Sequence, residues 1–245
     1  MLVAAGAIYG VSSSSAFAVT TVEMTGATFT DATDLQAAID GVQGTNLFTL
    51  RTGPLEVTLR DLPTVDSAQV TVRLPNTLAV AVKERAAVMV WKVGARRYLA
   101  AADGALFARL TDTSTDAGVG LPVIEDRRAS SAGLYVGVHL DPVDLDAATR
   151  LASLVPADVG SGAEHLVVWV TDDNGFVVRT QPGSWTAVFG YYTASLRTPA
   201  LIPGQVVLLK SLLYGREDTI DRVILASDTD GTYVPKATPK PSASP

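Results

Sequence analysis

The spacing of apolar residues predicts a strand and two helices at the start of the chain. Residues 17–26 alternate between apolar and polar positions, which indicates a first strand. A helix is predicted to begin at Thr30-Asp31, with either residue as its N-cap, because the apolar residues after it recur at helical spacing. A second helix is predicted after Gly53-Pro54 and ends before Pro63, since proline cannot continue a helix.

A hairpin completes the front part. Residues 68–74 alternate cleanly, residues 78–82 do so again, and Pro75-Asn76 lies between them as a turn. Period-two alternation with one apolar side predicts a sheet that is covered on one face. The predicted order is therefore β-α-α-β-β.

The remainder of the chain is mainly strands, with two amphipathic helices. One helix is predicted from Asp141-Pro142 to Val155, and the other from Pro203 to Leu213. Asp172-Asp173-Asn174-Gly175 predicts a hairpin turn, because an Asn-Gly pair tolerates positive φ. The predicted strands are at 88–93, 96–99, 105–110, 166–170, 176–179, 185–190, 220–225 and 232–234.

Composition supports a folded, non-nucleic-acid-binding protein. The 245 residues are 47% hydrophobic and 18% charged, which is enough apolar material for a core. The net charge is −6, and no basic run offers the footprint that nucleic acid or an anionic lipid surface requires. The fold class is α+β.

The two ends differ from the middle. Residues 1–11 are apolar and uncharged, but a spanning helix needs about 20 such residues. Three interpretations stay open: the outer half of a transmembrane helix, a signal peptide that ends at Ala16-Phe17-Ala18, or the hydrophobic start of a soluble domain. At the other end, Pro, Ser and Lys predict a disordered tail at 235–245.

The sequence shows no group of residues typical of a catalytic or metal-binding site. The chain lacks cysteine, so disulfides and thiolate chemistry are excluded, and its two histidines, His139 and His165, are not at metal-ligand spacing. The Asp-rich stretches at 172–175 and 228–231 lack the remainder of a calcium loop and predict turns instead. The sequence therefore predicts no catalytic residue, no metal, no cofactor and no small-molecule substrate.

Several segments resemble the POTRA domain of the FtsQ/DivIB cell-division family. In the front part they are 17–26, Gly44-Thr45-Asn46-Leu47-Phe48, Leu59-x-x-Leu62-Pro63-x-Val65 and Leu74-Pro75-Asn76-Thr77-Leu78, with Glu84-Arg85 closing the hairpin. Beyond the POTRA domain, later segments also resemble this family: Trp91, Asp103-Gly104-x-Leu106-Phe107, Leu121-Pro122-Val123-Ile124, Val188-Phe189-Gly190 and Lys210 before Leu212-Leu213. Each ends or redirects an element, and none does chemistry.

The resemblance implies an organisation and a role. It implies a truncated anchor at 1–16, a POTRA domain at 17–86, and a mostly antiparallel β domain with two or three helices at 87–234. It also implies a single-pass protein of the bacterial plasma membrane, held by an N-terminal helix, with its bulk outside the cytoplasm at the division septum. Such a protein is a non-enzymatic scaffold for septal peptidoglycan synthesis machinery and for the FtsB–FtsL coiled coil.

Recognition through a sheet edge is the implied mechanism, since a partner can add a strand to an exposed edge. Carried over by position, the resemblance implicates the last long strand and the segment after it, namely Arg222, Ile224, Ala226, Asp228 and Tyr233. From the sequence alone, the same strand is equally an ordinary internal strand. A second candidate surface in the front part comprises Gln69, Thr71 and Arg73.

Two other functions are alternatives. A POTRA-containing periplasmic transport or outer-membrane assembly module would need repeated units or barrel strands, and the sequence has one unit. A secreted enzyme would need convergent ionisable residues.

Overall fold

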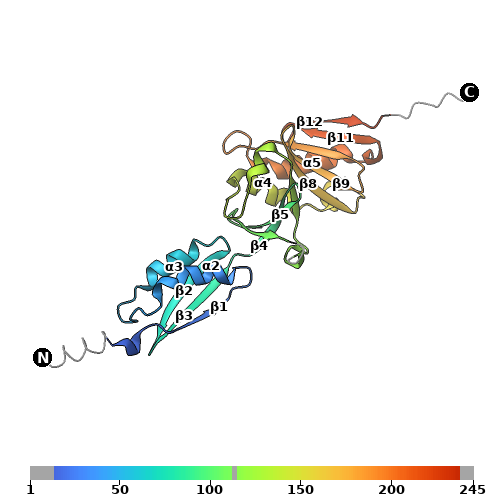
Figure 1. The fold of residues 1–245 in the computed structure, drawn as a ribbon. Helices are drawn as coiled ribbons and strands as arrows, with labels where there is room; N and C mark the ends of the chain where they lie inside the picture. Colours follow the sequence, from blue (N-terminus) through green and yellow to red (C-terminus); the bar gives the residue numbers. More distant parts are fainter. Residues whose placement is uncertain (1–13, 112–114, 238–245) are drawn as a thin grey trace, which may run out of the picture. The chain divides into compact units, whose positions relative to one another are not determined.

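The computed structural model describes residues 14–111 and 115–237, and the chain divides between Ala86 and Ala87 into two compact units (Figure 1). Residues 1–13 of the predicted anchor and 238–245 of the predicted tail lie outside the described residues. No helix in the described part has the length and apolar content needed to cross a bilayer.

The first unit confirms the predicted β-α-α-β-β order. Its elements are β1 (Thr21–Thr25), α2 (Ala32–Ile39), α3 (Thr52–Arg60), β2 (Val65–Arg73) and β3 (Thr77–Glu84), with short 3₁₀ helices η1 (Ser15–Phe17) and η2 (Asp40–Val42). The strand order is β1-β3-β2, with β1 parallel and β2 antiparallel to β3. Both helices lie on one face of this sheet (Figure 1).

Local chemistry explains where these elements begin. The Asp31 carboxylate accepts a hydrogen bond from the Thr33 N–H at 2.8 Å, so Asp31 is the N-cap of α2. The core beneath the helices contains Ile39, Leu59 and Leu78, all with exposed fractions of 0%. These are the apolar positions whose spacing predicted the helices and the hairpin.

The first strand is shorter than predicted. Residues 17–19 are not part of β1 and lie beside the loop after η2. The Val19 N–H donates to the Thr45 carbonyl at 2.9 Å, and the Gly44 N–H donates to the Val19 carbonyl at 3.0 Å. Val19 is buried in this position. The loop thus takes the backbone bonds that a longer β1 would have directed to the sheet.

The second unit is a nine-stranded mixed sheet with two longer helices. Its strands are β4 (Ala87–Val93), β5 (Arg96–Ala101), β6 (Leu106–Leu110), β7 (Val123–Asp126), β8 (His165–Thr171), β9 (Gly175–Gln181), β10 (Thr186–Gly190), β11 (Ile220–Leu225) and β12 (Gly231–Pro235). Its helices are α4 (Pro142–Ala152) and α5 (Ile202–Leu213), and its 3₁₀ helices are η3 (Thr115–Gly118), η4 (Ala129–Gly133), η5 (Pro156–Val159), η6 (Pro199–Leu201) and η7 (Glu217–Thr219).

The strand order, β12-β11-β10-β9-β8-β7-β4-β5-β6, places two β-α-β crossovers in this sheet. α4 connects the parallel strands β7 and β8, and α5 connects the parallel strands β10 and β11. Five of the eight described pairs are antiparallel, as expected for a mostly antiparallel domain. Strand β7 was not predicted.

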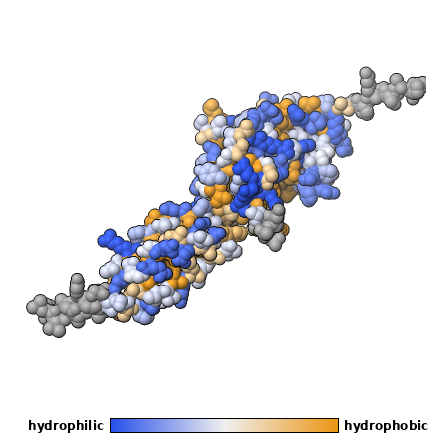
Figure 2. All heavy atoms as spheres, in the orientation of Figure 1, coloured by the Kyte–Doolittle hydropathy of each residue, from blue (hydrophilic) through white to orange (hydrophobic). Residues whose placement is uncertain are grey.

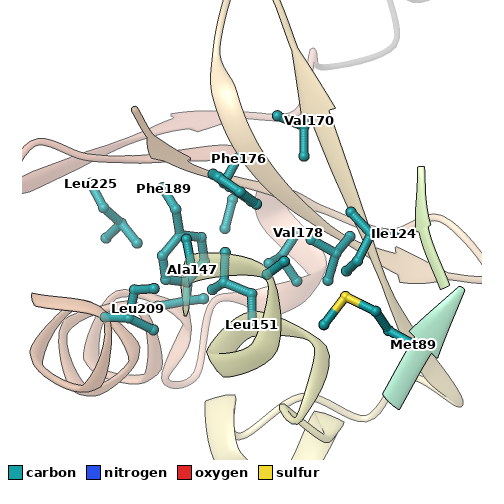
Figure 3. Close-up of a cluster of buried hydrophobic side chains, with 14 of the residues drawn as sticks. Met89, Ile124, Ala147, Leu151, Val170, Phe176, Val178, Phe189, Leu209 and Leu225 are labelled. Atoms are coloured by element: carbon teal, nitrogen blue, oxygen red, sulfur yellow. The ribbon is translucent and has the colours of Figure 1, made fainter. Parts of the chain in front are cut away.

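The two helices cover one face of the sheet and form the main core. Figure 3 shows side chains from α4, α5 and the strands meeting there, among them Leu151, Leu209, Phe176, Val178 and Phe189. α4 ends at Ala152 rather than at Val155, because the chain leaves the helix at Ser153. A smaller cluster, with Leu99 and Phe107, covers the other face over β4 to β6.

Candidate partner-binding surfaces

The predicted edge comprised β11 and the segment after it, and of these two β11 is the second strand from the edge. It lies between β10 and β12, and β12 ends the sheet. β12 was seen in the sequence only as a short run after a turn, and the order of a sheet is set by pairings that a sequence does not display. The described part of the chain contains no strand on the outer side of β12.

The outer side of β12 has a definite pattern of backbone groups. The Lys236 N–H donates to the Thr219 carbonyl at 2.8 Å, so at Lys236 the backbone faces β11. Because backbone groups alternate along an extended chain, Val234 and Thr232 also face β11, whereas Tyr233 and Gly231 face outward. Pro235, which has no N–H, takes an outward position where no ladder bond is lost.

The side chains of β11 and β12 are divided between two faces. Arg222 lies opposite Val234, and Ile224 opposite Thr232, on the face away from the helices. Tyr233 lies opposite the buried Val223 on the helix-covered face. There the Arg216 guanidinium lies 5.6 Å from the Tyr233 ring and donates to its hydroxyl at 3.4 Å.

The two remaining residues predicted from the resemblance lie at the turn between β11 and β12. The Ala226 carbonyl accepts a hydrogen bond from Arg197, and Asp228 is exposed. The Ser227 hydroxyl oxygen holds the turn by accepting from the N–H groups of Thr229, at 3.1 Å, and Asp230, at 2.9 Å. The structure therefore groups Arg222 with Ile224, and places Ala226, Asp228 and Tyr233 elsewhere; which of them touch a partner stays a prediction.

A polar cluster that sequence reasoning missed fixes the carboxyl ends of β10 and β11. Arg197 donates to the carbonyls of Phe189, at 2.6 Å, and Leu225, at 2.7 Å. The buried Gln205 amide lies against the same two carbonyls, and its oxygen accepts from the Tyr192 hydroxyl at 2.7 Å. Burial raises the pKa of Tyr192, so its hydroxyl stays protonated and remains a donor.

Glu217 holds the opposite end of β11. Its carboxylate accepts hydrogen bonds from the Trp185 indole at 2.9 Å, the Gly162 N–H at 3.1 Å and the Ser161 hydroxyl. Burial acts to raise the pKa of Glu217, but the hydrogen bonds from Ser161 and Trp185 outweigh it, so the pKa lies below its ordinary value. β11 is thus anchored at both ends, which gives β12 a fixed template.

The first unit brings its three predicted residues together. Gln69, Thr71 and Arg73 are exposed at alternate positions of β2, which is an outer strand of its sheet. Arg73 forms an ion pair with Glu23 of β1 at 2.9 Å, across the intervening β3. Both side chains are more than half exposed, so this pair contributes little stability.

Residues 17–85 match the model of the POTRA domain, FtsQ-type. The first unit therefore contains a POTRA domain of the FtsQ type. Comparison with curated proteins gave no match. A domain of this type suggests a role in cell division.

Within the POTRA domain, the residues that close the hairpin have separate tasks. The Glu84 carboxylate accepts from the N–H groups of Phe29, at 2.8 Å, and Thr30, at 2.7 Å, which secures the approach to α2. Arg85 donates from Nε to the Pro63 carbonyl at 3.0 Å. Both side chains therefore bind backbone groups within the POTRA domain.

No metal-binding group emerges from the described ranges 14–111 and 115–237. The segment 172–175 forms the predicted β8–β9 hairpin, and the Asp172 carboxylate accepts from the Ala129 N–H at 2.8 Å. On the face of the molecule shown in Figure 2, hydrophilic and hydrophobic residues are interspersed over both units, so hydropathy alone does not mark a binding surface there.

Proposed function

We propose that this FtsQ-type protein is a bacterial division scaffold that captures a strand of a partner protein on the outer side of β12. The observation that carries the proposal is that β12 ends the sheet and that its neighbour is anchored at both ends; alternation along β12 then directs the backbone groups of Gly231 and Tyr233 outward. A fixed edge loses little conformational entropy when it binds an extended chain.

The proposed setting is the division septum, with the chain tethered to the plasma membrane by its N-terminus and both units outside the cytoplasm. A tether would concentrate the units near other septal proteins and strengthen weak contacts. The family resemblance supports an FtsB-like chain of an FtsB–FtsL coiled coil as the partner on β12. The POTRA surface of Gln69, Thr71 and Arg73 is proposed as a second contact for the division machinery.

A proline substitution tests the edge directly. Tyr233→Pro removes the outward N–H but leaves the groups that bond to β11, whereas Tyr233→Ala removes only the side chain. In a strain depleted of the native protein, we expect Tyr233→Ala to restore septation and Tyr233→Pro to leave filaments, although both accumulate and unfold at similar temperatures.

The same pair of variants separates the backbone from the side chain in biochemical assays. Co-purification of the division proteins should be retained by Tyr233→Ala and lost by Tyr233→Pro. Equal loss in both would assign recognition to the tyrosine ring and refute strand addition. Full activity in both would remove β12 from the mechanism, and normal division after clean deletion of the gene would refute the proposed role itself.

A further inference from the structure

A row of side chains crosses the second sheet on the face away from α4 and α5. Successive strand pairings place Glu125 beside Trp169, Trp169 beside Val177, and Val177 beside Val188. The row runs from β7 to β10, between the cluster that covers β4 to β6 and the edge at β12. Trp169 is at its centre and is partly exposed.

Two hollows of about 320 and 350 Å³ lie on this face and share the side chains of Trp169 and Arg179. Val123 and Val167 line the first, and Val177 and Val188 line the second. Each hollow therefore has β-branched apolar walls beside a cationic group, which is a mixed surface rather than a purely charged one.

The arginines on this face are held in place by the indole. The guanidinium carbons of Arg127 and Arg179 lie 3.4 and 4.2 Å from the centroid of the Trp169 ring. Stacking of this kind orders a guanidinium and leaves its N–H groups available to a carboxylate. The rotamer entropy of these side chains is then partly lost before any partner arrives.

Much of the positive charge is not neutralised within the domain. The lining residues include three arginines, Arg127, Arg179 and Arg222, and two carboxylates, Glu125 and Asp221. Glu125 is already engaged by Arg127 at 2.8 Å and Lys92 at 3.3 Å. Among the described residues, Arg179 and Arg222 have no carboxylate partner, although the whole chain has a net charge of −6.

We infer that the face centred on Trp169 is a docking surface for an acidic segment of a partner polypeptide, with glutamate or aspartate alternating with apolar residues. Its carboxylates would bind the ordered arginines, and its apolar side chains would enter the valine-lined hollows. A polypeptide is favoured over a phosphate-rich polymer because such a polymer makes no use of the valine walls. This surface does not depend on the β12 edge.

The probe is a labelled twelve-residue peptide that alternates glutamate with valine, measured against the full chain by fluorescence polarisation. A lysine–valine peptide and inorganic polyphosphate serve as comparisons. Trp169 supplies a second signal, because Trp91 and Trp185 are buried, with exposed fractions of 0% and 2%. We expect the glutamate–valine peptide alone to bind, to shield Trp169 from acrylamide quenching and to dissociate as salt is raised.

Substitutions of the arginines test whether the peptide binds at the Trp169 face. Changing Arg127 and Arg179 together to alanine should weaken peptide binding by about tenfold or more, since charged pairs across an interface are involved. Arg150→Ala is the matched control, because Arg150 is an exposed arginine that pairs with Asp146 on α4. Arg179→Glu should transfer binding to the lysine–valine peptide, a gain that a misfolded protein cannot give.

The remaining outcomes overturn the inference. Equal binding of polyphosphate would show an anion-polymer surface, and concentration-dependent self-association lost in the double variant would show a surface for a second copy. Absence of binding by the glutamate–valine peptide to the folded wild-type chain would also contradict it. If Tyr233→Pro abolished binding of the glutamate–valine peptide while the Trp169 face was intact, the two surfaces would be one binding site that includes the β12 edge.

Discussion

The Glu56 carboxylate in α3 accepts a hydrogen bond from the backbone N–H of Val70 in β2, over a distance of 2.9 Å. β2 is an outer strand of the POTRA sheet. The hydrogen bond to Glu56 shows that the Val70 N–H points outward from the sheet and not toward β3. An exposed N–H at a sheet edge is a docking point for a foreign strand. Glu56 therefore covers the POTRA edge at the middle of β2.

Removing this carboxylate should expose the edge. We expect Glu56→Ala to lower the free energy of unfolding by about 1 kcal/mol, because one hydrogen bond to a charged group is lost at a partly exposed site. It should also increase self-association, which size-exclusion chromatography over a concentration series will detect. Glu56→Gln keeps an acceptor oxygen and is the control; if it associates as strongly as alanine, the hydrogen bond is not what protects the edge.

The β8–β9 turn was predicted because an Asn-Gly pair tolerates positive φ, and of these two residues only Gly175 has a positive φ. Its φ is +63°, whereas no non-glycine residue in the described part has positive φ, Asn174 included. A Cβ at this position would lie 2.4 Å from the Gly190 carbonyl oxygen. Gly175→Ala should therefore destabilise the second unit by about 2 to 4 kcal/mol, from backbone strain and overpacking together.

Gly53→Ala is the control for that measurement. Gly53 lies in α3 with open space around its Cα, so alanine should stabilise the POTRA domain by about 0.5 to 1 kcal/mol. Urea unfolding of both variants will give opposite changes in midpoint if the conformation of each glycine decides the outcome. A stable Gly175→Ala protein would mean that the β9–β10 contact can move.

The sequence pattern predicted the elements that are determined by residues close together in the chain. The hairpin of β2 and β3 was readable because alternation over a few residues fixes which side is buried, and Val70, Leu78 and Val80 are buried as expected. β7 was missed because it has only four residues, and two of them are Glu125 and Asp126. Its place depends on parallel pairing with β4 and β8, far apart in sequence.

The candidate surfaces were only partly predictable for the same reason. Gln69, Thr71 and Arg73 lie together because they alternate along one strand, and their contact with a partner stays a prediction. The predicted edge comprised β11 and the segment after it, and only that later segment, β12, ends the sheet, since the order of strands depends on the crossover through α5. Arg197 and Gln205 gave no signal at all, because a polar residue in a loop or on an amphipathic helix ordinarily faces water.

We expect Asp126 to make the stability of the second unit depend on pH. It is buried, with an exposed fraction of 1%, and its carboxylate accepts hydrogen bonds from Arg128 at 2.8 Å, Ser131 at 2.6 Å and the Trp91 indole at 3.2 Å. Burial acts to raise the pKa of Asp126, but the Arg128 and Ser131 hydrogen bonds outweigh it and hold the pKa below its ordinary 3.8.

That direction of the pKa decides the sign of the pH effect. A carboxyl whose pKa is lower in the folded state stabilises the fold fully above its unfolded-state pKa, near 3.8, and loses this stabilisation as the pH falls through the folded-state pKa. We expect Asp126→Asn to cost about 3 kcal/mol at pH 7, because Arg128 loses a buried partner. Urea unfolding between pH 7 and pH 3 should show a weaker acid dependence in the variant; parallel curves would assign the acid sensitivity to other carboxyls.

Gln205 and Tyr192 form a buried pair whose contribution can be separated by a double-mutant cycle. Gln205→Leu has similar volume but leaves the Tyr192 hydroxyl without its acceptor, so we expect a loss of about 1 to 3 kcal/mol in unfolding free energy. Tyr192→Phe removes the hydroxyl and keeps the ring against Phe176. The double variant leaves no orphaned hydroxyl, and it should be more stable than the sum of the single changes implies, by at least about 0.5 kcal/mol.

Additive losses would mean that Gln205 acts through the Phe189 and Leu225 carbonyls alone. In that case the defect should be matched by Arg197→Ala, which removes the other donor to the same two carbonyls.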